Sequence, residues 1–109
     1  MAAVALACVA LMACENAGQP ADDVARDLGN QLSAELRAYR DTGLEARLET
    51  ARITCVQIAT EATEGRLYGT DYGRALASAC DVVGVLGTDP GVHVETAISL
   101  VDLALQMLR

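Results

Sequence analysis

Four cysteines and one histidine are the side chains of this chain best suited to covalent or metal chemistry. Cys8 and Cys14 belong to an apolar N-terminal stretch, whereas Cys55 and Cys80 lie far from it. A c-type haem needs Cys-x-x-Cys-His, and a di-iron bundle needs paired Glu-x-x-His elements. Neither motif occurs, and His93, the single histidine, is expected to be a surface side chain near a helix start. The sequence therefore predicts no catalytic residue, no metal site and no cofactor.

The N-terminal stretch predicts export. Residues 1–13 form an unbroken apolar run, too short for the roughly 20 residues of a spanning helix but long enough for a signal-peptide core. The run ends in Leu11-Met12-Ala13-Cys14. This tetrapeptide resembles the bacterial lipobox, with an aliphatic residue three positions before the cysteine and a small residue directly before it.

The resemblance implies that a diacylglycerol group is attached to Cys14 and that the chain is cut before it. Residues 1–13 are then a signal peptide, residues 14–19 a lipidated tether and residues 20–109 a helical domain. No Lys or Arg precedes the apolar run, so the positive charge of the segment is reduced to the amino terminus. The alternative is a buried N-terminal helix of a cytosolic protein. Cys8 is the poorer lipidation site because little apolar chain comes before it.

The tether limits where the domain can work. Its five residues after Cys14 reach at most about 17 Å. The expected location is therefore the bacterial cell envelope, facing the periplasm or the outer surface, with the domain held close to its membrane by the lipid.

Residues 20–109 carry four helical patterns separated by turn signals, which predict an all-α fold, a small antiparallel four-helix bundle. The first pattern starts with Pro20 at the first helical position and runs to about Arg40. The second starts with a Thr42/Glu45 capping box and runs to about Glu64. Their predicted inward residues lie three and four apart: Val24, Leu28, Leu32, Leu36 and Tyr39 in the first, and Leu44, Leu48, Ala51, Cys55, Ile58 or Ala59, and Ala62 in the second.

The third pattern is capped by Thr70 or Asp71 and carries apolar residues as far as Leu86. The fourth begins at Asp89-Pro90 and runs to the end of the chain. The fourth has one polar stripe and is otherwise apolar, which favours a central position in the bundle. The alternative is an oligomer or partner contact through this fourth helix. The polar stripe consists of Glu95, Ser99, Asp102 and Gln106.

Cys55 and Cys80 are expected to form a disulfide. They fall on the inward stripes of the second and third helices, at nearly equal distances from the loop between them. In an antiparallel hairpin they face each other, and export would favour their oxidation. If the chain stays in the cytosol, the alternative is a pair of buried thiols.

The loop between these two helices is the best candidate interface that the sequence offers. Tyr68 and Tyr72 flank it, with Arg66 and Arg74 close by in the sequence, and exposed Tyr and Arg are enriched in protein interfaces. The commoner alternative is that Tyr72 packs inward and Tyr68 covers a helix end.

The net charge of the chain excludes some classes of binding partner. It has eight basic residues, all of them Arg, and fifteen acidic residues, giving a net charge of −7. Such a surface repels nucleic acid and anionic lipid headgroups but can meet a basic protein surface. We therefore expect a non-enzymatic envelope lipoprotein, an interaction or structural module for another envelope protein. The alternatives are a small-ligand-binding or enzymatic bundle, and a phage or mobile-element lipoprotein that blocks superinfection or DNA entry.

Overall fold

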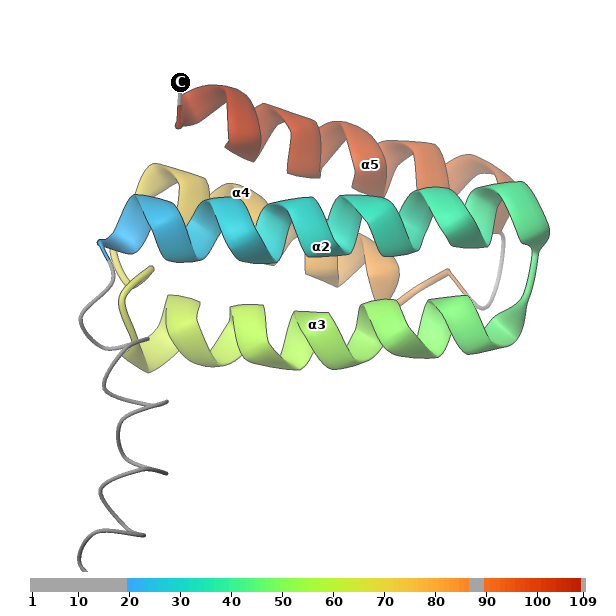
Figure 1. Cartoon of the computed structure of the whole chain (residues 1–109), viewed down its shortest axis with the longest axis horizontal. Coiled ribbons are helices and arrows are strands. Elements are labelled where there is room, and N and C mark those ends of the chain that lie inside the picture. The colour runs from blue at the N-terminus through green and yellow to red at the C-terminus, as the bar shows by residue number, and fades with distance from the viewer. Residues whose placement is uncertain (1–19, 87–89, 109) are drawn as a thin grey trace, which may run out of the picture.

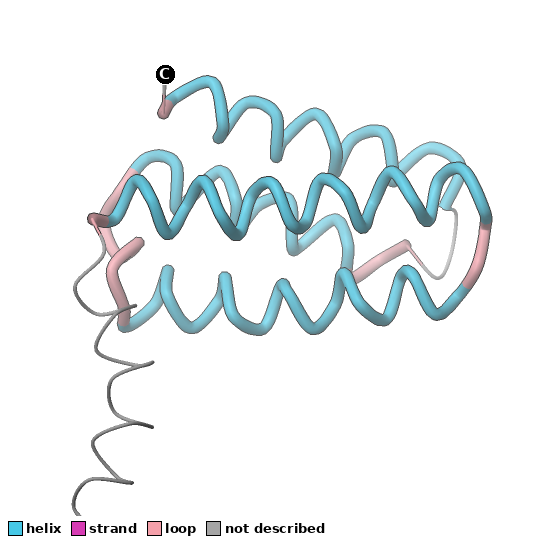
Figure 2. Tube along the Cα trace, viewed as in Figure 1, coloured by secondary structure: helices cyan, strands magenta, loops and turns pink. Residues whose placement is uncertain are grey.

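The fold is a four-helix bundle, as predicted. The structure is a computed structural model that describes residues 20–86 and 90–108. Within these ranges it contains no strand and four helices: α2 (Ala21–Thr42), α3 (Glu45–Glu64), α4 (Asp71–Val83) and α5 (Pro90–Met107). Figure 2 shows that successive helices run in opposite directions. The predicted signal peptide, the tether, Asp89 and Arg109 lie outside the described residues.

The four helices occupy the corners of the bundle. Helices α2 and α4 each pack against both α3 and α5, so α3 and α5 stand at opposite corners (Figure 1). This arrangement corrects the expected central position of the last helix, because α5 is itself a corner. Two of its large apolar residues, Leu103 and Met107, remain exposed.

The core is aliphatic and rich in alanine, as the absence of Phe and Trp requires. The α2 stripe is buried as predicted, with Leu28 partly buried, and Ile58 is the member of the Ile58/Ala59 pair that points inward. Each fully buried leucine contributes about 1.5–3 kcal/mol to folding. Alanines with no exposed surface let the helices approach closely; they are Ala25, Ala51, Ala79, Ala97 and Ala104.

The connection between α2 and α3 differs from the prediction. The Thr42/Glu45 capping box does not form, because Thr42 is the last residue of α2 and its hydroxyl donates to the carbonyl of Ala38 at 2.7 Å. Gly43 then takes a φ of +69°, which favours glycine, and turns the chain. Leu44 precedes α3 as its N-cap residue and is exposed, so the expectation that it packs inward is wrong.

The other helix starts are closer to expectation. Pro20 stands one position earlier than predicted, directly before α2. Thr70 caps α4 by accepting a hydrogen bond from the N–H of Gly73 at 3.0 Å. Helix α4 ends at Val83, but the following turn still buries Leu86.

The polar stripe of α5 faces partly toward α2 rather than wholly into solvent. Arg37 of α2 pairs with Asp102 at 3.1 Å, and Arg40 pairs with Glu95 at 3.3 Å. Hydrogen bonds to Asp41 and Glu95 raise the pKa of Arg40 above its already high ordinary value. These pairs lie along the boundary between the two helices.

Candidate functional site

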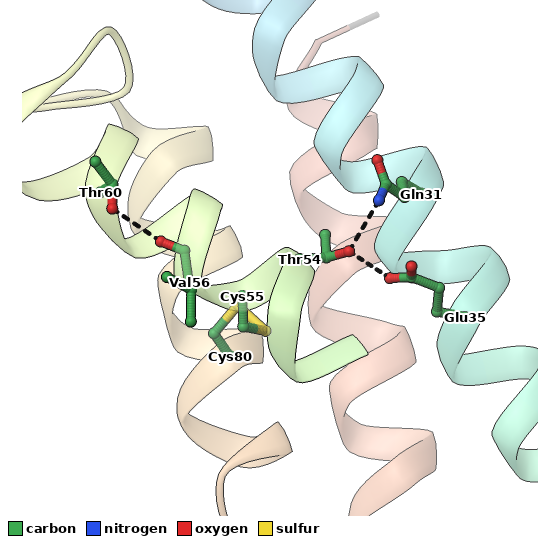
Figure 3. Close-up of a disulfide and its surroundings, with 7 residues drawn as sticks. All are labelled: Gln31, Glu35, Thr54, Cys55, Val56, Thr60 and Cys80. Atoms are coloured by element: carbon green, nitrogen blue, oxygen red, sulfur yellow. Dashed lines mark hydrogen bonds between the residues drawn. A yellow bond between two sulfur atoms is a disulfide. The ribbon is translucent and has the colours of Figure 1, made fainter. Parts of the chain in front are cut away.

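The Cys55–Cys80 pair links α3 to α4 (Figure 3). The two Cα atoms are 5.4 Å apart, within the usual range for a disulfide. Cys55 is buried and Cys80 is partly buried, so the bridge lies at the edge of the core. The residues predicted to pair are therefore the ones that meet.

Thr54 is a buried polar side chain that the sequence analysis missed. It has no exposed surface and is the buried polar residue of the described ranges. Its hydroxyl accepts a hydrogen bond from Gln31 Nε2 at 3.0 Å and donates one to Glu35 Oε1 at 2.6 Å (Figure 3). Gln31 and Glu35 lie one helical turn apart on α2, so the cluster fixes how α3 sits against α2.

The chemistry open to this cluster is limited by its burial. A hydroxyl that donates to a carboxylate has part of the arrangement of an activated nucleophile. In this cluster the Thr54 oxygen is covered by the packing of α2 against α3, and both of its hydrogen bonds are made within the protein. We therefore assign Thr54 a structural role.

The predicted loop interface is only partly presented to solvent. Tyr68 is exposed, whereas Tyr72 is partly buried and packs against the core. The exposed Arg74 pairs with Asp71 one turn away. The loop interface stays a prediction, with Tyr68 and Arg74 as its accessible members.

Arg66 is held by the end of α3. Its backbone N–H donates to Glu61 Oε2 at 2.9 Å, and its Nη2 lies 3.5 Å from Glu61 Oε1. Both side chains are about three-quarters covered. Arg66 therefore stabilises the turn after α3, and Tyr68 is the aromatic side chain of the loop that is exposed to solvent.

The outer side of α3 is a second surface that the sequence analysis missed. Ile53 is 62% exposed and Val56 is 67% exposed. Residues 53–60 contain no charged side chain. The exposed residues along this line form what we call the α3 strip: Ile53, Val56, Gln57, Thr60 and Thr63.

The threonines of the α3 strip do not offer free hydroxyl donors. Thr60 Oγ1 donates to the carbonyl of Val56 at 3.0 Å, and Thr63 Oγ1 donates to that of Ala59 at 2.7 Å. Because the hydroxyls bond to their own helix, the polarity that they show to a partner is reduced.

The outer side of α5, like that of α3, exposes large apolar side chains. Leu103 and Met107 are each 45% exposed. They adjoin Ser99 and Gln106 of the polar stripe, beside Asp102, which pairs with Arg37 of α2. We call the exposed uncharged residues here the α5 strip: Ser99, Leu103, Gln106 and Met107. His93, near the start of α5, is partly exposed as expected.

Comparison with known proteins gives no family. No model of a protein family matches the chain, and no curated protein or solved structure is significantly similar to it. Residues 20–86 and 90–108 hold no group of three His, Cys, Asp or Glu side chains placed to bind a metal ion. None of the helices in these ranges is long and apolar enough to cross a membrane.

The first prediction concerns the disulfide, which closes a loop with a sequence separation of 25. Replacing both cysteines, Cys55→Ala with Cys80→Ala, should lower the free energy of unfolding by about 3.5 kcal/mol, because the unfolded chain regains the entropy of the open loop. Urea denaturation measures this loss. A reductant should destabilise the wild type similarly and leave the double variant unchanged; an unaffected wild type would contradict the prediction.

The second prediction concerns Thr54. The variant Thr54→Val keeps the shape of the side chain but removes both hydrogen bonds to α2, and should cost about 1 kcal/mol of folding free energy. Thr60→Val is the matched control, because this exposed threonine bonds only to its own helix and should change stability by less than about 0.5 kcal/mol. Equal losses in the two variants would show that the cluster does not stabilise the α2–α3 contact.

Proposed function

We propose that this chain is a non-enzymatic lipoprotein of the bacterial cell envelope, an interaction module held near the membrane by a lipid on Cys14. The observation that carries the interaction part is the pair of uncharged strips on α3 and α5. The outer side of a solvent-facing helix is usually polar and charged. The middle of α3 departs from that pattern, and on α5 Leu103 and Met107 are exposed beside the charged Asp102.

The positions of the strips support a role in bringing molecules together. Helices α3 and α5 lie at opposite corners, so their outer sides face away from each other (Figure 1). One molecule could contact another envelope protein through one strip and a further protein or a second copy through the other. Oligomerisation through α5 belongs to this proposal.

The anchor part of the proposal is supported by Leu11-Met12-Ala13-Cys14 and by the disulfide. Disulfides persist outside the reducing cytosol, and the Cys55–Cys80 pair is placed to form one. The short tether would keep both strips within reach of membrane-bound partners. The net charge of −7 argues against nucleic acid as a partner.

The third prediction concerns processing at Cys14. Intact-mass analysis of the protein from its host should show a chain that starts at Cys14, carries acyl groups and lacks two hydrogen atoms because of the disulfide. Cys14→Ala should stay unprocessed and unlipidated, whereas the matched control Cys8→Ala should be processed normally. A wild-type mass that starts at Met1 with four free thiols would refute the anchor.

The fourth prediction concerns the strips. A photo-crosslinking amino acid in place of Val56 or Leu103 should give discrete adducts with another envelope protein or a second copy in living cells. The same amino acid in place of Asp27, exposed on α2, is the control and should give none. Absence of adducts at both strips would argue against an interaction module, even if Cys14 is lipidated.

A further inference from the structure

We propose that the α3 strip docks a helix of another protein that has an apolar centre and basic residues at both ends. This inference rests on the proposed function and names the class of partner for one of its two surfaces. It is argued from the apolar middle of the strip, from the charges at its ends and from the poor fit of a second copy.

The middle of the strip suits an apolar helix face. Ile53 and Val56 expose most of their side chains at neighbouring positions on the helix. The Thr60 and Thr63 hydroxyls are already bonded to α3 itself, so covering them leaves no donor without an acceptor. Gln57 is the one strongly polar side chain, and its amide can stay at the edge of a contact.

The ends of the strip are acidic. At the start, Glu45 and Glu49 are both exposed and share a single arginine, Arg52, so these three side chains carry one net negative charge. The exposed Arg47 is two residues from each glutamate and therefore lies on the opposite side of the helix. At the other end, Glu64 is exposed and has no ion-pair partner within the described chain. The chain as a whole adds a long-range attraction for a basic partner.

The distance between these acidic residues predicts the length of the partner helix. Glu49 and Glu64 are fifteen positions apart on one helix, so they lie about 22 Å apart at roughly 1.5 Å per residue. A partner helix of about four turns, with Lys or Arg near each end and apolar residues between them, matches both the acids and the uncharged middle.

A second copy of the chain fits the strip less well. In an antiparallel pairing centred between Val56 and Gln57, Glu49 of each copy faces Glu64 of the other. In a parallel pairing each acid faces itself. Both registers bring like charges together, which costs binding free energy. An anionic membrane surface is disfavoured for the same reason.

The test uses the protein purified from its host. It is placed in nanodiscs of zwitterionic lipid, with empty nanodiscs as background, if it is lipidated, and it is used free in solution if it is not. The probe is an 18-residue amphipathic helical peptide with a leucine stripe and lysines fifteen positions apart. A second peptide carries glutamates in place of the lysines. Fluorescence anisotropy measures binding, and we expect the basic-ended peptide to bind at least tenfold more tightly than the acidic-ended one, with affinity falling as salt increases.

Variants of the protein locate the site. Val56→Asp should abolish binding of the basic-ended peptide, and Glu49→Gln with Glu64→Gln should weaken it threefold to tenfold. Leu103→Asp on the α5 strip is the matched control and should bind like the wild type. The four substitutions in these three variants are all at exposed positions, and circular dichroism checks that each variant is folded.

Four results would overturn the inference: equal binding of the two peptides, loss of binding in Leu103→Asp but not in Val56→Asp, a protein dimer abolished by Val56→Asp, or binding to anionic vesicles through the strip. Failure of the peptide would leave the proposed function standing if Cys14 is lipidated and the crosslinks at Val56 or Leu103 form. An unlipidated Cys14 with intact peptide binding would refute the anchor and keep the docking surface.

Discussion

Close packing of four helices across an aliphatic, alanine-rich core is the constraint on which the rest of the structure depends. With no Phe or Trp in the chain, and Tyr39 the buried ring among the described residues, the core gains most of its apolar contacts by bringing backbones together. Each helix can then cover only a narrow stripe of its neighbour. Apolar residues beyond that stripe, such as Val56 on α3 and Leu103 on α5, stay at the surface.

The same constraint explains how polar groups hold the bundle. Little room remains inside, so the described interior accepts one polar side chain, Thr54, and satisfies it from α2. The remaining cross-helix polar contacts run along boundaries, as in the Arg37–Asp102 pair between α2 and α5. The Cys55–Cys80 disulfide joins a different pair of helices, α3 and α4. Polar and covalent links therefore cross different pairs of helices around the core.

The sequence predicts what local periodicity controls. The fold class, the buried stripe of α2, the cap at Thr70 and the approach of Cys55 to Cys80 follow from spacing within one helix or across one hairpin. Other features depend on which helices become neighbours. They are the corner position of α5, the pairing of Thr54 with Glu35 and the exposure of the α3 strip. The spacing predicts that Leu44 points inward, but Gly43 turns the chain before α3 begins and leaves Leu44 exposed. The residues around the loop are of interface types, but for Tyr72 the structure shows the alternative that the sequence also offers, which is inward packing.

The proposed anchor, the two strips and the acidic charge would each restrict which molecules the domain can bind. A lipid on Cys14 with a tether of at most about 17 Å would keep the domain at one membrane and concentrate it near proteins of that membrane. The acidic surface would hold it off anionic lipid headgroups, so the bundle need not lie flat on the bilayer. Under those two conditions, a strip with acidic ends and an apolar middle is reachable from the side. Weak docking would then be sufficient, because such an anchor would supply the local concentration that affinity otherwise has to provide.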